Sequence, residues 1–164
     1  MSSDSYESSS SSGTSSSVIS WIHWYCSLPG HDLLLEVPEE FIEDEFNLTG
    51  LPSLVPLYAA ALDTILDLEP ETNTVIASAS LIDSSAELLY GLIHARYLIT
   101  KAGLSGWADK VGTCGGVCPR IGCGKCWTVP AGLSDTPGVD TVKMYCPRCG
   151  DMYHPTEVIS SSFF

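Results

Sequence analysis

Six of the seven cysteines lie close together, between positions 114 and 149. Their short spacings are those at which two thiolates bind one metal ion, most clearly in Cys146-Pro-Arg-Cys149. A stretch of about 50 residues buries too little apolar surface to fold unaided, and a bound ion would supply the missing stability. We therefore expect a small metal-stabilised module in the last third of the chain.

The residues alone leave two ligand sets open. Cys146 and Cys149 belong to both sets. The other two ligands could be Cys118 with Cys123, or Cys123 with Cys126, and spacing slightly favours the second pair because it gives two CxxC turns. Either set supplies four thiolates, which fill the coordination sphere of zinc and leave no position for a reacting water. The predicted cofactor is structural Zn²⁺.

The charge of the chain is strongly and unevenly negative. It has 164 residues and a formal net charge of −13, with 16 of its 20 acidic side chains in residues 1–109. This balance opposes nucleic-acid binding driven by bulk charge, and no apolar stretch approaches the roughly 20 residues that a membrane span needs. The N-terminal region is serine-rich and acidic, without the pattern of a secretory signal, so we expect a cytoplasmic and nuclear protein.

Apolar periodicity predicts four helices before the cysteine-rich part. The first contains Cys26, read as a small buried hydrophobe, and the second begins near Pro38. The third and fourth are expected over about 53–68 and 75–100, with Lys101 and Gly103 as stop signals. Gly91 lies inside the fourth helix, where we expect close packing to favour it.

The predicted fold class is α+β, with an all-α N-terminal domain before a small zinc-ribbon-like antiparallel β module. Residues 1–17, of which 11 are serine, should form a disordered acidic tail. The other expected divisions are an acidic helical domain at 18–109, a four-cysteine module at 110–157 and a short C-terminal tail at 158–164.

Several stretches carry a resemblance to a known family. They are FNLTGL (46–51), ALDTILDLEP (61–70), LYGLIHARYLIT (89–100), CPRIGC (118–123), GLSDTPG (132–138) and VKMYCPRCGDMY (142–153). On these residues the chain resembles the regulatory beta subunit of casein kinase II. The zinc motif of that family, CPxxxC followed by CPxC, matches Cys118, Cys123, Cys146 and Cys149. The resemblance therefore selects the first ligand set and leaves Cys114 and Cys126 as extra thiols.

The resemblance also implies a function. Family members are non-catalytic regulatory subunits that form homodimers through the zinc module, bind the catalytic subunit of the kinase, and modulate its stability and its selection of protein substrates. By match to the family, the predicted dimer contacts are Pro119, Ile121, Leu133 and Met152, and the predicted phosphorylation sites are Ser2 and Ser3. The docking region of the family for the catalytic subunit follows the zinc module, so this chain is expected to be truncated relative to the family.

Two other classes of function are less consistent with the sequence. A zinc-ribbon nucleic-acid-binding or transcription-associated module is the alternative, because four basic residues surround the cysteines: Arg120, Lys125, Lys143 and Arg148. An enzyme is disfavoured because the histidines lack metal-ligand or triad spacing: they are His23, His31, His94 and His154. We therefore expect no catalytic residues.

Overall fold

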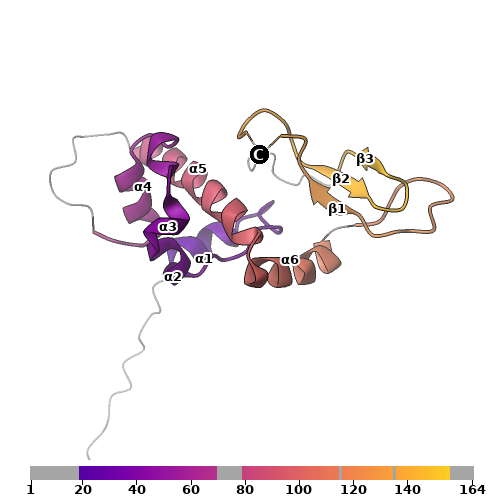
Figure 1. Ribbon diagram of the computed structural model, residues 1–164, viewed down its shortest axis with the longest axis horizontal. Coiled ribbons are helices and arrows are strands. Elements are labelled where there is room, and N and C mark those ends of the chain that lie inside the picture. Colours follow the sequence, from indigo (N-terminus) through magenta and orange to yellow (C-terminus); the bar gives the residue numbers. More distant parts are fainter. Residues whose placement is uncertain (1–18, 70–78, 115, 135, 156–164) are drawn as a thin grey trace, which may run out of the picture.

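The computed structural model describes residues 19–69, 79–114, 116–134 and 136–155 (Figure 1). The predicted tails at 1–17 and 158–164, with Ser2 and Ser3, lie outside these residues. The described elements are α1 (Trp21–Cys26), α2 (Glu39–Glu43), α3 (Glu45–Leu48), the 3-10 helix η1 (Leu51–Ser53), α4 (Tyr58–Ile65), α5 (Ala79–Leu98), α6 (Lys101–Cys114), β1 (Val129–Ala131), β2 (Lys143–Cys146) and β3 (Asp151–Tyr153).

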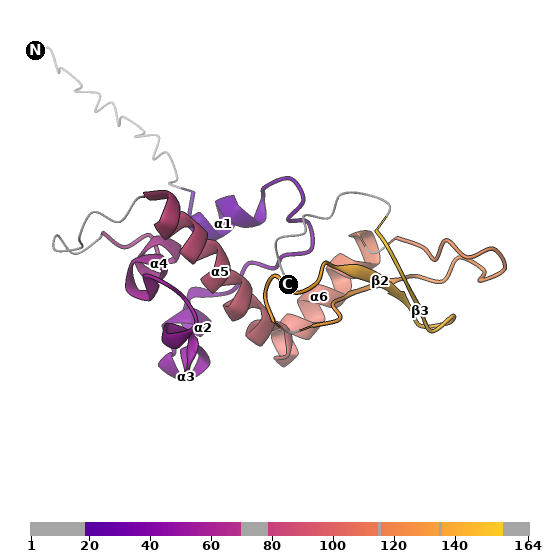
Figure 2. The same cartoon turned by 90° about the horizontal axis from the view of Figure 1, so that it is seen from above.

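Helix α5 is the centre of the helical part. Its residues Ala86, Leu89, Tyr90 and Ile93 recur at spacings of three, one and three, which places them on one face of the helix, and all are fully buried. They pack in one apolar cluster with residues of α1 and α4, including Ala61 of α4. Figure 2 shows α5 running between these helices. The expected long central helix is thus confirmed over its described length.

The start of the second helix is confirmed, and the third predicted helix is wrong at its beginning. Helix α2 starts directly after Pro38. The stretch expected to be helical from about residue 53 contains η1, then a break, and α4 begins only at Tyr58. Leu57, just before α4, has a left-handed backbone with φ of 49°. Pro56 also lacks the N–H that a continuous helix would need there, so the helix cannot extend through this point.

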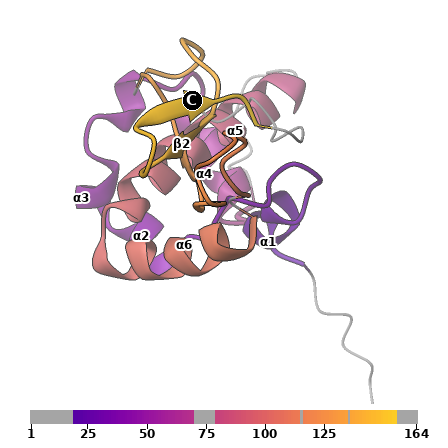
Figure 3. The ribbon, with the colours of Figure 1, turned by 90° about the vertical axis from the view of Figure 1, so that its right-hand side faces the viewer.

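Helix α6 was not expected from the sequence. The fourth predicted helix ends close to the expected place, since α5 ends at Leu98, but Lys101 and Gly103 then lie in the first turn of a new helix. Thr100 caps it, since its Oγ1 accepts the N–H of Gly103 at 3.0 Å. Helix α6 then runs from the end of α5 toward the chain that leads to the sheet (Figure 1), and in Figure 3 it lies at the bottom of the view with β2 at the top. The expected domain boundary at 109/110 falls inside α6, and the domain limits stay a prediction.

Gly103 is required where α5 turns into α6. A Cβ atom at this position would lie 2.1 Å from the carbonyl oxygen of Tyr97, which is backbone that cannot move aside. Gly91 differs, because a Cβ there would meet no heavy atom within 4 Å. Close packing therefore does not explain Gly91, contrary to our expectation.

Gly103→Ala is expected to destabilise the chain by about 1–3 kcal/mol, because the α5–α6 junction must open to admit the methyl group. Gly91→Ala is the matched control in an open helical position, and should raise the free energy of unfolding by about 0.5–1 kcal/mol. Urea unfolding followed by far-UV circular dichroism measures both changes. Equal effects of the two substitutions would contradict the close approach at Gly103.

The cysteine-rich part forms a three-stranded antiparallel sheet in the order β1-β2-β3. Val129 of β1 pairs with Tyr145 of β2, which pairs with Met152 of β3. Cys146 is fully buried, whereas the neighbouring Tyr145 faces the other side of the sheet and is 37% exposed. The α+β fold class is confirmed, with helices and sheet at opposite ends of Figure 1.

Residues 34–37 form an extended strap held by the two long helices. His94 of α5 accepts the N–H of Leu35 at Nε2, at 3.0 Å, so this nitrogen is unprotonated. Lys110 of α6 donates from Nζ to the carbonyl oxygen of Leu34. Burial, together with the charge of Lys110, lowers the pKa of His94 to about 4. The imidazole is therefore a neutral structural acceptor.

Acidification is expected to destabilise the helical part through His94. Its pKa of about 4 in the folded chain lies below the ordinary value of 6.5. Between these two pH values the unfolded chain binds a proton that the folded chain does not, so stability is lost as the pH falls through this window. The loss reaches about 3 kcal/mol near pH 4.

Urea unfolding at about pH 7 and about pH 4.5 measures this loss in the parent chain and in His94→Gln, which keeps an acceptor but does not titrate. The variant should lose less stability on acidification. The same pH dependence in both chains would exclude His94 as the cause.

Within the described ranges, no helix combines the length and the apolar character needed to cross a membrane.

Candidate metal centre

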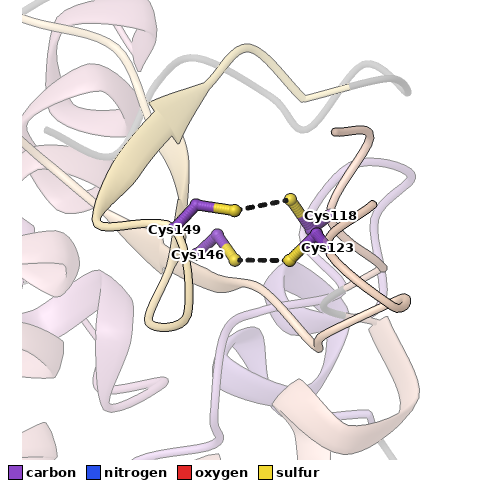
Figure 4. A group of neighbouring side chains, drawn as sticks. All are labelled: Cys118, Cys123, Cys146 and Cys149. Atoms are coloured by element: carbon purple, nitrogen blue, oxygen red, sulfur yellow. Dashed lines mark hydrogen bonds between the residues drawn. The ribbon is translucent and has the colours of Figure 1, made fainter. Parts of the chain in front are cut away.

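Two chain segments bring four cysteines together. Cys118 and Cys123 lie on the loop that follows α6, and Cys146 ends β2. Cys149 lies in the tight turn between β2 and β3, where the N–H of Gly150 donates to the carbonyl oxygen of Cys146 at 2.9 Å. The turn places the thiols of Cys146 and Cys149 beside those of Cys118 and Cys123 on the loop (Figure 4).

The sulfur atoms are spaced as a tetrahedral metal ion requires. Cys118 Sγ lies 3.9 Å from Cys149 Sγ, and Cys123 Sγ lies 3.6 Å from Cys146 Sγ. All four sulfurs lie within 4.8 Å of one another. Four sulfurs at about 2.3 Å from a central zinc ion would be about 3.8 Å apart. The observed separations therefore fit one tetrahedral ion.

The site is closed to solvent on most sides. Cys118, Cys123 and Cys146 are buried and Cys149 is half-buried. The ring of Tyr153 packs against them, and its buried hydroxyl has no hydrogen-bond partner in the described part of the chain. A thiolate on Cys118 or Cys149 would accept a hydrogen bond from this hydroxyl, as the sulfur ligand of a metal ion can.

The thiols differ in their tendency to ionise. Burial raises the pKa of Cys146, but hydrogen bonds outweigh it and lower the pKa to about 6. They come from the backbone N–H of Cys149 and Arg148 and from the thiols of Cys118 and Cys123. Cys146 is therefore poised to be a thiolate at neutral pH, which is the form that binds metal.

The geometry favours the ligand set that contains Cys118 over the set that contains Cys126. Cys118 belongs to the group of four sulfurs, whereas Cys126 packs against the group without joining it. This is the grouping that the resemblance favoured and that spacing alone did not. The side chain of Cys114 lies outside the described part of the structure. Cys26 is distant, in α1, where it is half-buried and close to Tyr90.

The predicted dimer contacts lie on the surface of the same module. Ile121 is fully exposed, Leu133 is 68% exposed, and Pro119 is exposed as well. Met152 is half-buried beside Tyr145 on the outer face of the sheet. These side chains are therefore accessible to a partner. Their part in dimerisation stays a prediction.

Three of the four basic residues near the cysteines are engaged within the chain. Arg120 pairs with Asp151 at 2.5 Å, and Lys143 pairs with Asp140 at 3.1 Å. Arg148 donates to the carbonyl oxygen of Cys123. The contact of Arg148 joins the two cysteine segments, and all three contacts reduce the positive charge available for phosphates. The nucleic-acid alternative gains no support from them.

The histidines do not assemble with one another or with the cysteines. His23 contacts Glu36 at 2.9 Å, and His31 contacts the backbone oxygen of Tyr25 at 2.7 Å. His94 is the acceptor for the strap described above, and His154 is exposed near the end of the described chain. Among the described residues, the four cysteines form the group that could hold a metal ion.

Fold and site together define a helical protein with a four-cysteine, zinc-ribbon-like module. Residues 20–164 match the casein kinase II regulatory subunit family. The chain is 42% identical to casein kinase II subunit beta-1 of Neurospora crassa, over 95% of this chain and 57% of the relative. It is 46% identical to casein kinase II subunit beta of Dictyostelium discoideum, over 84% of this chain and 52% of the relative. It is also 46% identical to casein kinase II subunit beta-2 of Schizosaccharomyces pombe, over 89% of this chain and 59% of the relative.

The chain belongs to the casein kinase II regulatory subunit family. It spans a little over half the length of the curated relatives that it matches. The family is one of regulatory subunits, which agrees with the expectation that the chain is not an enzyme.

Proposed function

We propose that this chain is a non-catalytic regulatory subunit of casein kinase II whose sheet module contains one structural Zn²⁺. The observation that carries the proposal is the tetrahedral spacing of the sulfurs of Cys118, Cys123, Cys146 and Cys149. Four thiolates complete the coordination of zinc, so the ion stabilises the fold and offers no site for a reaction.

Dimerisation through this module is the second part of the proposal. The zinc joins the loop of Cys118 and Cys123 to the sheet, and so fixes the position of Ile121 on that loop relative to Met152 on β3. A fully exposed isoleucine is costly in water, and pairing of two modules would bury it with Leu133. The proposed dimer therefore depends on the metal.

Leu133→Asp is expected to convert the dimer to a monomer, because a buried unpaired carboxylate opposes association. Leu54→Asp is the matched control, since Leu54 is a similarly exposed leucine, at 62%, in the helical part. Sedimentation equilibrium of the zinc-loaded chains gives the masses. A monomeric parent chain, or a dimeric Leu133→Asp variant, would contradict the proposed interface.

The partner is the third part. Family membership supports association with the catalytic subunit of casein kinase II. As part of the proposal, this association modulates the stability of the kinase and its choice of protein substrates, in cytoplasm and nucleus. Co-elution of the purified chain with a purified catalytic subunit on gel filtration tests this. Separate elution of the two would reject kinase binding by this chain, while the zinc site and the dimer would stand on their own measurements.

A further inference from the structure

Cys126 lies beside the metal centre although its sulfur is not one of the four. Its half-buried side chain packs against Cys118, Cys123 and Cys146. Its Sγ lies 3.5 Å from the carbonyl oxygen of Trp127, a weak contact at the surface of the module. A fifth thiol is thus held next to a site that needs four.

The backbone places Cys126 directly opposite Cys118. Val117 and Trp127 form an antiparallel bridge. On one side of it the N–H of Cys118 donates to the carbonyl oxygen of Cys126 at 2.8 Å. Residues opposed in this way point their side chains to the same face, with Cβ atoms about 5 Å apart. The thiols of Cys118 and Cys126 are therefore neighbours on the face toward the cluster.

The turn from Cys123 to Cys126 also repeats a feature of the turn from Cys146 to Cys149. In each CxxC turn, the thiol of the first cysteine accepts the backbone N–H of the second. In the turn after β2 the second cysteine, Cys149, belongs to the group of four. Cys126 occupies the corresponding position in the other turn.

We propose that Cys126 is a reserve zinc ligand that replaces Cys118, so that the centre has two alternative sets of four thiolates. The inference rests on the proposed zinc site. In the exchange the zinc–sulfur bond to Cys118 breaks as the bond to Cys126 forms, and the proton released by Cys126 is balanced by one taken up on Cys118. The charge of the centre is unchanged and no oxidation occurs.

Zinc content of full-length variants after gel filtration tests the exchange. Cys118→Ser should retain about one zinc per chain because Cys126 completes the set. The double variant Cys118→Ser with Cys126→Ser should retain less than about a tenth of that, and Cys146→Ser should do the same, since Cys146 belongs to both sets. Cys26→Ser is the control for removal of a thiol outside the centre.

The outcomes separate this inference from the proposed function. Zinc in the parent chain but not in Cys118→Ser would overturn the reserve ligand alone. A natively folded parent chain without zinc would overturn the proposed metal centre, and the reserve ligand with it.

A second measurement avoids any change to the four clustered cysteines. The zinc-loaded parent chain is pulsed with iodoacetamide, and the alkylated peptides are identified by mass spectrometry. Cys118 should react faster than Cys123, because only Cys118 is released when Cys126 binds. Cys126→Ser should slow the alkylation of Cys118 several-fold, to the rate of Cys123. An unchanged rate at Cys118 would overturn the exchange.

Discussion

Replacing Cys146 with serine is expected to remove zinc from the chain and to unfold the sheet of β1, β2 and β3. Cys146 is fully buried, its thiol favours the ionised form, and it belongs to both ligand sets. Zinc contributes roughly 10–16 kcal/mol, as an apparent value at neutral pH, to the folding of small modules. Metal content should therefore fall from about one ion per chain to nearly none.

Elemental analysis gives the metal content, and near-UV circular dichroism reports the environment of Tyr145 and Tyr153 in the sheet. Helices α1 to α5 have their own apolar core, so the far-UV helical signal should survive in large part. Cys26→Ser should keep both the zinc and the near-UV signal. A Cys146→Ser chain with full zinc content would show that this thiol is not a ligand.

Removing one hydroxyl from the helical core is expected to have the second largest effect. Tyr90 is fully buried, and its hydroxyl donates to the carbonyl oxygen of Leu35 at 2.7 Å and accepts the N–H of Val37 at 3.1 Å. Tyr90→Phe leaves the N–H of Val37 without this partner, whereas the carbonyl oxygen of Leu35 keeps only a weak contact with the Cys26 thiol at 3.6 Å. An unpaired buried group costs about 1–3 kcal/mol and the weakened one somewhat less, so the free energy of unfolding should fall by about 2–4 kcal/mol.

Tyr97→Phe is the matched control on the same helix, because the half-buried ring of Tyr97 packs edge-on against Phe41 and the substitution keeps that contact. It should change stability by less than about 1 kcal/mol. Urea unfolding at neutral pH measures both variants. A Tyr90→Phe chain as stable as the control would mean that the strap is held by other contacts.

The features that sequence predicts well are those with a repeating or chemical pattern. The apolar period predicts α5, and the cysteine spacing predicts the candidate metal site, because burial at helical spacing and metal ligation each restrict which residue types occur. Pro38 predicts the start of α2 because its fixed φ and its missing N–H suit that position.

The features that sequence missed depend on tertiary contacts. Helix α6 contains Gly103, Gly106 and Gly112, whose low helix propensity argues against a helix. It forms nevertheless, packed at the end of α5, and its Lys110 donates to the carbonyl oxygen of Leu34 in the strap. Gly103 reads as a stop signal in isolation, and only the close approach to Tyr97 explains it as part of a helix start.

The ligand choice is a second case in which local spacing was insufficient. Cys123 and Cys126 have the more regular spacing, but the bridge of Val117 with Trp127 folds Cys118 back beside Cys126. Because the two thiols are then neighbours, spacing cannot decide which sulfur joins the cluster. The arrangement of the loop against the sheet decides it.

X-ray absorption at the zinc edge, with the metal content of the natively folded chain measured in parallel, tests the central claim most directly. The account predicts one zinc ion per chain surrounded by four sulfur atoms at about 2.3 Å. A folded chain without zinc, or an ion bound to two sulfurs or fewer, would contradict it.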